Sequence, residues 1–117
     1  MANPNIVNVS AIYGETVAVS ATTANANVVQ NSSTGEVYKV NYLNISNLTD
    51  TNTVAITIDI IKSDSYFSLI RDISIPVGAS LTVLAKDTSL YLQEGDALSC
   101  SASEANAHVV CSYERIG

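Results

Sequence analysis

Apolar and polar side chains alternate along almost the whole chain. Runs with a two-residue repeat cover positions 6–13, 16–21, 27–30, 36–47, 54–62, 66–75, 80–84 and 89–92, and two further runs lie on either side of Ala105-Asn106. A repeat of two is the pattern of a half-buried strand, and no segment of ten residues or more has a helical repeat. The pattern predicts an all-β protein, an antiparallel β-sandwich or jelly roll of about eight to ten short strands, with the whole of 1–117 in a single domain.

Short turn sequences between these runs predict which strands form hairpins. Gly14-Glu15 is expected to join the first two runs, and Ser63-Asp64 the runs 54–62 and 66–75. The second turn sets a register in which cross-strand pairs have matching character. The pairs it predicts are Ile60 with Phe67, Ile58 with Leu69, and Asp59 with Ser68.

The last two runs are predicted to form a closing hairpin around Ala105-Asn106. This register places Cys100 directly opposite Cys111. It also divides the side chains into two faces. The core face holds Leu98, Cys100, Ala102, Val109, Cys111 and Tyr113, and the outer face holds Ser99, Ser101, Ser103, His108, Val110 and Ser112.

The amino-acid composition mainly argues against two classes of binding partner, nucleic acids and anionic membranes. Eleven acidic and five basic residues give a net charge of −6, which disfavours binding to nucleic acid or to an anionic membrane. The N-terminus lacks the features of a signal peptide, and no apolar run approaches the ~20 residues of a membrane helix. Residues 1–8 are a candidate N-terminal arm that orders on a neighbouring molecule, with Asn5 and Ile6 as candidate interface residues.

Few residues offer chemistry. Cys100 and Cys111 are interpreted as a pair of buried thiols or as a disulfide, and two thiols with a single histidine give too few zinc ligands. His108 has no recognisable nucleophile and carboxylate beside it, so we expect a surface histidine and no catalytic residue, metal or cofactor. Tyr38 and Tyr42 share a strand parity, and both are candidate interface residues.

Asparagines begin several N-x-Ser/Thr sequences in this chain. They are expected by chance where Asn, Ser and Thr are so frequent, and none is taken as a glycosylation site. They start at Asn8, Asn31, Asn44 and Asn47.

Four segments of the C-terminal part carry a resemblance to a known family. They read Ile75-Pro-Val-Gly-Ala-Ser-Leu, Leu90-Tyr-Leu-Gln-Glu-Gly-Asp-Ala-Leu, Ser101-Ala-Ser-Glu-Ala-Asn-Ala and Cys111-Ser-Tyr-Glu-Arg-Ile. In combination they resemble small virion structural proteins of tailed bacteriophages, of the type that infects cyanobacteria and other marine bacteria. The likeness covers about the last 45 residues, and the N-terminal half is similar only in composition.

The resemblance implies a non-enzymatic protein carried on the phage particle. The leading hypothesis is a capsid cement or decoration protein that stabilises the head lattice. Its partners would be the major capsid protein or other virion proteins and further copies of itself, with a trimer as the candidate oligomer and assembly in the host cytoplasm. The alternatives are a neck, tail or fibre component, or an adhesin-like module that binds carbohydrate.

Overall fold

The computed structural model describes residues 11–117, apart from the side chain of Lys86, and this part of the chain is almost entirely β-structure. One short 3-10 turn, η2 (Lys86–Thr88), interrupts the strands. The strands are β1 (Ile12–Ala21), β2 (Ala26–Gln30), β3 (Val37–Asn47), β4 (Val54–Lys62), β5 (Ser65–Ile75), β6 (Ser80–Leu84), β7 (Leu90–Leu92), β8 (Ala97–Ala102) and β9 (Ala107–Ile116). The predicted all-β fold is therefore confirmed.

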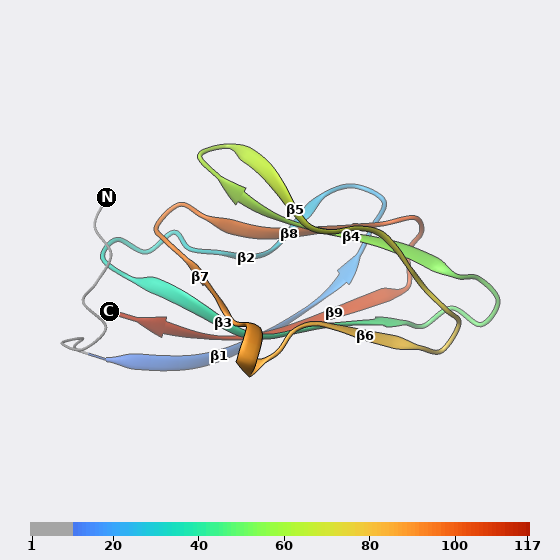
Figure 1. Ribbon diagram of the computed structural model, residues 1–117, viewed down its shortest axis with the longest axis horizontal. Helices are drawn as coiled ribbons and strands as arrows, with labels where there is room; N and C mark the ends of the chain where they lie inside the picture. Colours follow the sequence, from blue (N-terminus) through green and yellow to red (C-terminus); the bar gives the residue numbers. More distant parts are fainter. Residues whose placement is uncertain (1–10) are drawn as a thin grey trace.

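The strands form two antiparallel sheets that face each other as a sandwich (Figure 1). The five-stranded sheet has the order β1-β9-β3-β6, and β7 pairs with the same edge of β3 as β6 does. The four-stranded sheet has the order β2-β8-β4-β5. Each sheet thus ends in one long strand on an outer edge, β1 in the first and β5 in the second.

The closing hairpin predicted from the sequence does not form. β8 lies between β2 and β4, whereas β9 lies between β1 and β3, so the turn at 103–106 carries the chain from one sheet to the other. Cys100 therefore pairs with Ile58 and Ala26, not with Cys111. Alternation correctly identified Leu98, Cys100, Ala102, Val109 and Cys111 as core residues, whereas Ser99 of the predicted outer face is also buried. Alternation carries no information on which strand is the neighbour.

The first hairpin is also absent from the structure. β1 runs without a break from Ile12 to Ala21, in a single register with β9, and Gly14 and Glu15 pair with Glu114 and Tyr113. Gly14 needs no positive φ angle, so nothing turns the chain there. The predicted positions 6–10 lie outside the described residues.

The β4–β5 hairpin was predicted more accurately. Its turn is Ser63-Asp64, with φ of 51° and 64°, as a two-residue turn between right-twisted strands requires. The pairs Ile60–Phe67 and Asp59–Ser68 are confirmed, but Ile58 pairs with Ile70. Leu69 is an extra residue in a β-bulge, and a second irregularity follows near Asp72, whose φ is 51°.

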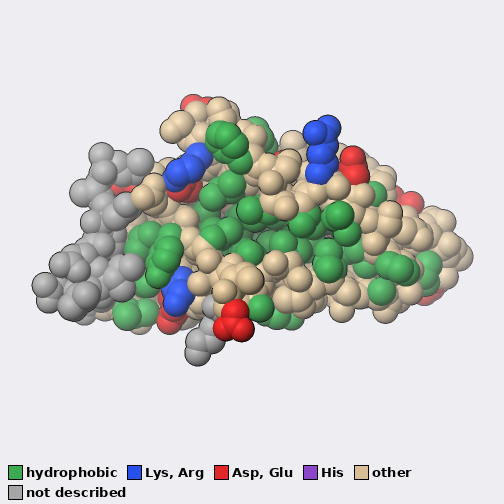
Figure 2. Space-filling view, viewed as in Figure 1, with side chains coloured by type: hydrophobic (Ala, Val, Ile, Leu, Met, Phe, Trp, Pro, Cys, Tyr) green, Lys and Arg blue, Asp and Glu red, His purple; other side chains and the backbone are tan. Residues whose placement is uncertain are grey.

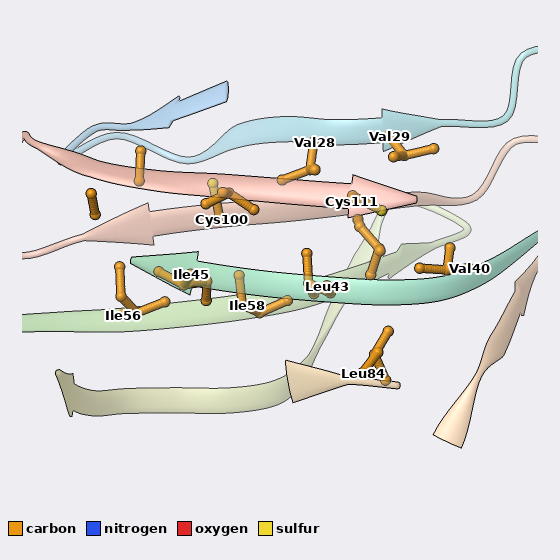
Figure 3. Close-up of a cluster of buried hydrophobic side chains, with 14 of the residues drawn as sticks. Val28, Val29, Val40, Leu43, Ile45, Ile56, Ile58, Leu84, Cys100 and Cys111 are labelled. Carbon is orange, nitrogen blue, oxygen red and sulfur yellow. The ribbon is translucent and has the colours of Figure 1, made fainter. Parts of the chain in front are cut away.

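The core lies between the two sheets, where side chains from both inner faces interdigitate (Figure 3). Leu43 and Ile45 of β3 lie opposite Ile56 and Ile58 of β4, and all four are fully buried. The core contains aliphatic and small side chains, with Tyr38 as its buried aromatic residue among those described. Packing of branched side chains on pleated surfaces explains why Val, Ile and Leu are so frequent in this chain.

Two buried asparagines connect the sheets at their ends. The Asn31 side chain donates hydrogen bonds to the carbonyl oxygens of Glu36 (3.0 Å) and Leu92 (2.9 Å). The Asn47 side chain donates to the carbonyl oxygens of Asn52 and Ile75, both at 2.9 Å. In each case a strand of one sheet is tied to a strand of the other, so these amides fix the loops at the ends of β3.

Candidate assembly surface

The most unusual surface feature is a set of apolar side chains on β5. Phe67 and Ile73 pair with Ile60 and Ile56, whose parity faces the core, yet Phe67 is 56% and Ile73 41% exposed. Leu69, the bulge residue, is 38% exposed. Burying one such side chain contributes about 1.5–3 kcal/mol, so leaving three of them half in water forgoes a substantial stabilisation.

These side chains are exposed because the sandwich is open on this side. β5 is the last strand of its sheet and β6 the last strand of the other, and few contacts join the two. Leu81 and Val83 of β6 and Leu90 of β7 are only partly buried. Figure 2 shows apolar side chains along this opening, between the β4–β5 hairpin and β6. We call the six residues Phe67, Leu69, Ile73, Leu81, Val83 and Leu90 the apolar strip.

The edge of β1 on the opposite side of the sandwich is unpaired among the described residues. Ala11 and Gly117 exchange two backbone hydrogen bonds of 3.1 and 3.2 Å, which identifies them as a hydrogen-bonded pair of the antiparallel ladder. The register continues unbroken, so the odd-numbered residues of β1 bond to β9. The N–H and C=O groups of the even-numbered residues point away from the sheet, and they are Ile12, Gly14, Thr16, Ala18 and Ser20.

This edge has little of the protection that edge strands normally carry. Proline, bulges and inward-pointing charges prevent one sheet edge from pairing with another. β1 has no proline and no bulge, and Glu15 is its one charged residue. A long regular edge with free backbone groups is a surface suited to pairing with another strand.

The β1–β9–β3 end of the sandwich is held together by ion pairs. Arg115 donates from Nε and Nη2 to the two carboxylate oxygens of Glu36, at 3.1 and 3.3 Å, and its Nη1 lies 3.7 Å from Glu15. Its guanidinium also lies 5.7 Å from the ring centre of Tyr13. The hydrogen bond to Glu36 raises the pKa of Arg115 further, so these contacts keep one fixed charge state at ordinary pH.

Tyr38 and Tyr42 do not form a joint surface. A bulge at Asn41 reverses the parity between them, so Tyr38 faces inward and is 6% exposed, whereas Tyr42 faces outward and is 39% exposed. Tyr38 stacks on Tyr113 with ring centres 5.2 Å apart. The shared parity expected from the sequence is wrong, and Tyr38 is unavailable to a partner. Asn5 and Ile6 lie outside the described residues.

Cys100 and Cys111 are both free and buried, and they face the core from different sheets (Figure 3). Burial raises the pKa of the Cys111 thiol to about 12 and also raises the pKa of Cys100. Both thiols are therefore protonated and unreactive at neutral pH.

Two clefts in the described part of the chain are lined by few titratable side chains. A cleft of about 460 Å³ lies between the loops after β3 and β5, and Asp50 is the one titratable side chain that lines it. His108 is exposed in a second, smaller cleft beside Ala18 and Val110, without an acidic residue in its lining. Within residues 11–117 no three His, Cys, Asp or Glu side chains are grouped as metal ligands. No helix within residues 11–117 has the length and apolar character needed to cross a membrane.

The sequence contained only part of the signal for the apolar strip. Phe67 and Leu69 were predicted to pair with Ile60 and Ile58 on an apolar strand face, and the pattern that identified them is the one that marks buried residues. Their exposure depends on where β6 lies, which alternation does not reveal. The bulge at Leu69 is equally invisible, because an inserted residue in one strand leaves the composition unchanged.

Comparison with known proteins shows a likeness at the level of the fold. No protein-family model matches the chain, and no curated protein is similar enough to count as a match. A solved structure of a Bacillus endospore appendage, from a family of disulfide-linked pili, aligns with 90% of this chain and 87% of its own, with a TM-score of 0.52 and 18% sequence identity. At this identity the likeness shows a shared fold, and that fold occurs in a structural pilus protein.

Proposed function

We propose that this protein is a non-enzymatic structural subunit that assembles with further copies of itself. The observation that carries the proposal is the apolar strip. Phe67 and Ile73 of β5 point to the core side of their sheet, yet the facing sheet does not cover them and they remain exposed. Exposed apolar patches of this kind on a folded domain mark interaction surfaces. The free edge of β1 adds a second surface suited to pairing, on the other side of the sandwich.

The fold likeness supports the same class of function. The Bacillus endospore appendages that share this fold are pili. A filament is therefore one form the assembly would take. The four C-terminal segments that resemble phage virion proteins favour another form, a decoration or cement layer on a capsid, with the major capsid protein as partner and the virion as location.

Self-association of the purified chain tests the proposal. We expect light scattering after size exclusion to give masses above the 12.3 kDa of one chain, and negative-stain electron microscopy to show regular particles or filaments. Filaments would favour an appendage, and closed small oligomers that bind phage heads lacking this protein would favour a cement role. A chain that stays at 12.3 kDa up to millimolar concentration would contradict self-assembly.

A matched pair of variants links assembly to the apolar strip. Phe67→Asp places a charge in the strip, whereas Tyr66→Asp places one at the neighbouring position, which is equally exposed but has the opposite parity. We expect the first variant to lower self-association at least about tenfold, since a carboxylate resists burial, and the second to leave it unchanged. Equal effects of the two variants would mean that the strip is not the contact.

A further inference from the structure

We infer that the apolar strip of one copy receives residues 5–10 of a second copy as an added strand. This inference rests on the proposed function, because it names the segment through which copies join. Strand addition supplies affinity through backbone hydrogen bonds and specificity through alternate side chains.

The strip has the properties that an added strand requires. It lies between two sheet edges, β5 and β6, and neither has a strand partner on its outer side within the described part of the chain. The five-stranded sheet contributes the apolar residues Leu81, Val83 and Leu90 to the strip, and the four-stranded sheet contributes Phe67, Leu69 and Ile73. Figure 2 shows this apolar surface open to solvent at its centre. A single extended segment would cover both rows.

The segment 5–10 has a matching sequence. It reads Asn5-Ile-Val-Asn-Val-Ser10, so three of its six residues are branched and apolar, and none is charged. Such residues favour the extended conformation, and Pro4 just before them ends a strand on that side. At about 3.3 Å per residue, six residues span roughly 20 Å, close to the roughly 17 Å of the five-residue β6.

The position of Ala11 explains why the donor is a second copy. Ala11 pairs with Gly117 at the β1 edge, whereas the strip lies at the β5 and β6 edges on the other side of the sandwich. Placing two copies side by side brings the β1 side of one against the open side of the next. Because the two joined surfaces differ, the contact repeats head to tail and continues into an open chain of subunits.

Substitutions within the segment test the inference on the full chain. Val7→Asp and Val9→Asp charge one parity of the segment, and Asn8→Asp is the control that charges the other parity. We expect the double variant Val7→Asp/Val9→Asp to elute as a 12.3 kDa monomer and the control to assemble like the original chain. If the double variant assembles normally, the inference is overturned while the proposed self-assembly stands.

Direct binding provides a second measurement that does not depend on assembly. A fluorescent peptide with the sequence of residues 2–11 is titrated with the Val7→Asp/Val9→Asp chain, whose strip is intact and unoccupied on this view. We expect saturable anisotropy, weakened at least about tenfold when Phe67→Asp is added and unchanged when Tyr66→Asp is added. Absence of binding, or equal binding by both added variants, would overturn the inference. If the unmodified chain is itself monomeric at every concentration, the proposed function fails together with it.

Discussion

Asn31 directly follows β2 and Asn47 is the last residue of β3, and the two side chains make equivalent hydrogen bonds. Each is fully buried, each donates its amide to two backbone carbonyls, and each accepts the N–H of the residue two positions later, Ser33 at 3.1 Å and Thr49 at 2.9 Å. One of the carbonyls bonded by each amide belongs to the opposite sheet or its end, Leu92 for Asn31 and Ile75 for Asn47. At each end of the sandwich, one asparagine side chain therefore links the two sheets by hydrogen bonds.

The Asn47 amide should be essential to stability. Asn47→Ala leaves the carbonyls of Ile75 and Asn52 without their donor, so we expect a loss of about 2–4 kcal/mol in the free energy of unfolding measured with urea. Asn27→Ala is the control, since that exposed amide makes one 3.4 Å contact with Gln30 and should cost less than about 0.5 kcal/mol. Equal losses in the two variants would contradict the role of Asn47.

Asp96 and Lys62 provide a second test, in which burial differs between the partners. Lys62 Nζ lies 2.6 Å from Asp96 Oδ2, and the Gln93 N–H donates to the same oxygen at 3.0 Å. The Asp96 side chain is 5% exposed, whereas the Lys62 side chain is 45% exposed. We expect Asp96→Ala to cost about 2–3 kcal/mol and Lys62→Ala about 1 kcal/mol or less. A double-mutant cycle that gives no coupling energy would show that the ion pair contributes nothing.

Ser99 is expected to respond in the opposite direction. Its hydroxyl is 1% exposed, and Oγ has no hydrogen-bond partner among the described residues. Removing an unsatisfied buried hydroxyl relieves a desolvation cost, so Ser99→Ala should leave stability unchanged or raise it by up to about 1 kcal/mol. A loss above 1 kcal/mol in urea denaturation would reveal a hydrogen bond that this geometry does not contain.

The two thiols should be hidden in the native protein. Because burial raises the pKa of Cys111 to about 12, its thiolate fraction at pH 8 is about a thousandfold below that of an ordinary thiol. We expect no reaction with a thiol reagent at pH 8 without denaturant, and two reactive thiols per chain in denaturant without reductant. If no thiol reacts in denaturant, the two cysteines form a disulfide, which would contradict the free thiols of the structure.

Stability should fall on the alkaline side. The folded-state pKa values of Cys111 and Tyr113 are both raised to about 12, by burial first and, for Tyr113, by Glu15 as well. The unfolded chain therefore releases these protons earlier, from about pH 9 for the thiol and pH 10 for the phenol, so the free energy of unfolding decreases as pH rises from 9 towards 12. Tyr113→Phe should flatten this decrease in urea titrations, and an unchanged slope would contradict it.

The fold was largely predictable because its signal is local. Alternation identified the strands from 27 onward and the inward parity of residues such as Leu98 and Val109, since burial on one sheet face requires it. Partner choice was not predictable, because β8 and β9 have compatible patterns for a hairpin and yet belong to different sheets. The predicted parity of Tyr42 and the predicted pairing of Leu69 were wrong for the same reason, because a bulge in each strand shifts the register of the residues that follow it.

The candidate surface was harder to foresee than the core. Phe67 was predicted to pair with Ile60 on an apolar face, and the placement of β6 leaves it exposed. The free edge of β1 was concealed by the turn expected at Gly14-Glu15. Both features arise from long-range arrangement, which a single sequence does not encode in its local pattern.

The buried amides of Asn31 and Asn47 also bear on how the protein can be produced. Both residues begin N-x-Ser/Thr sequences, and in both the third residue is the one that bonds back to the asparagine. A host that attaches sugars to such asparagines during secretion would place a bulky, hydrophilic group on the nitrogen that has to enter the interior. Chains modified there would be unable to close the sandwich, so the acceptor motif is compatible with this fold only while it stays unmodified.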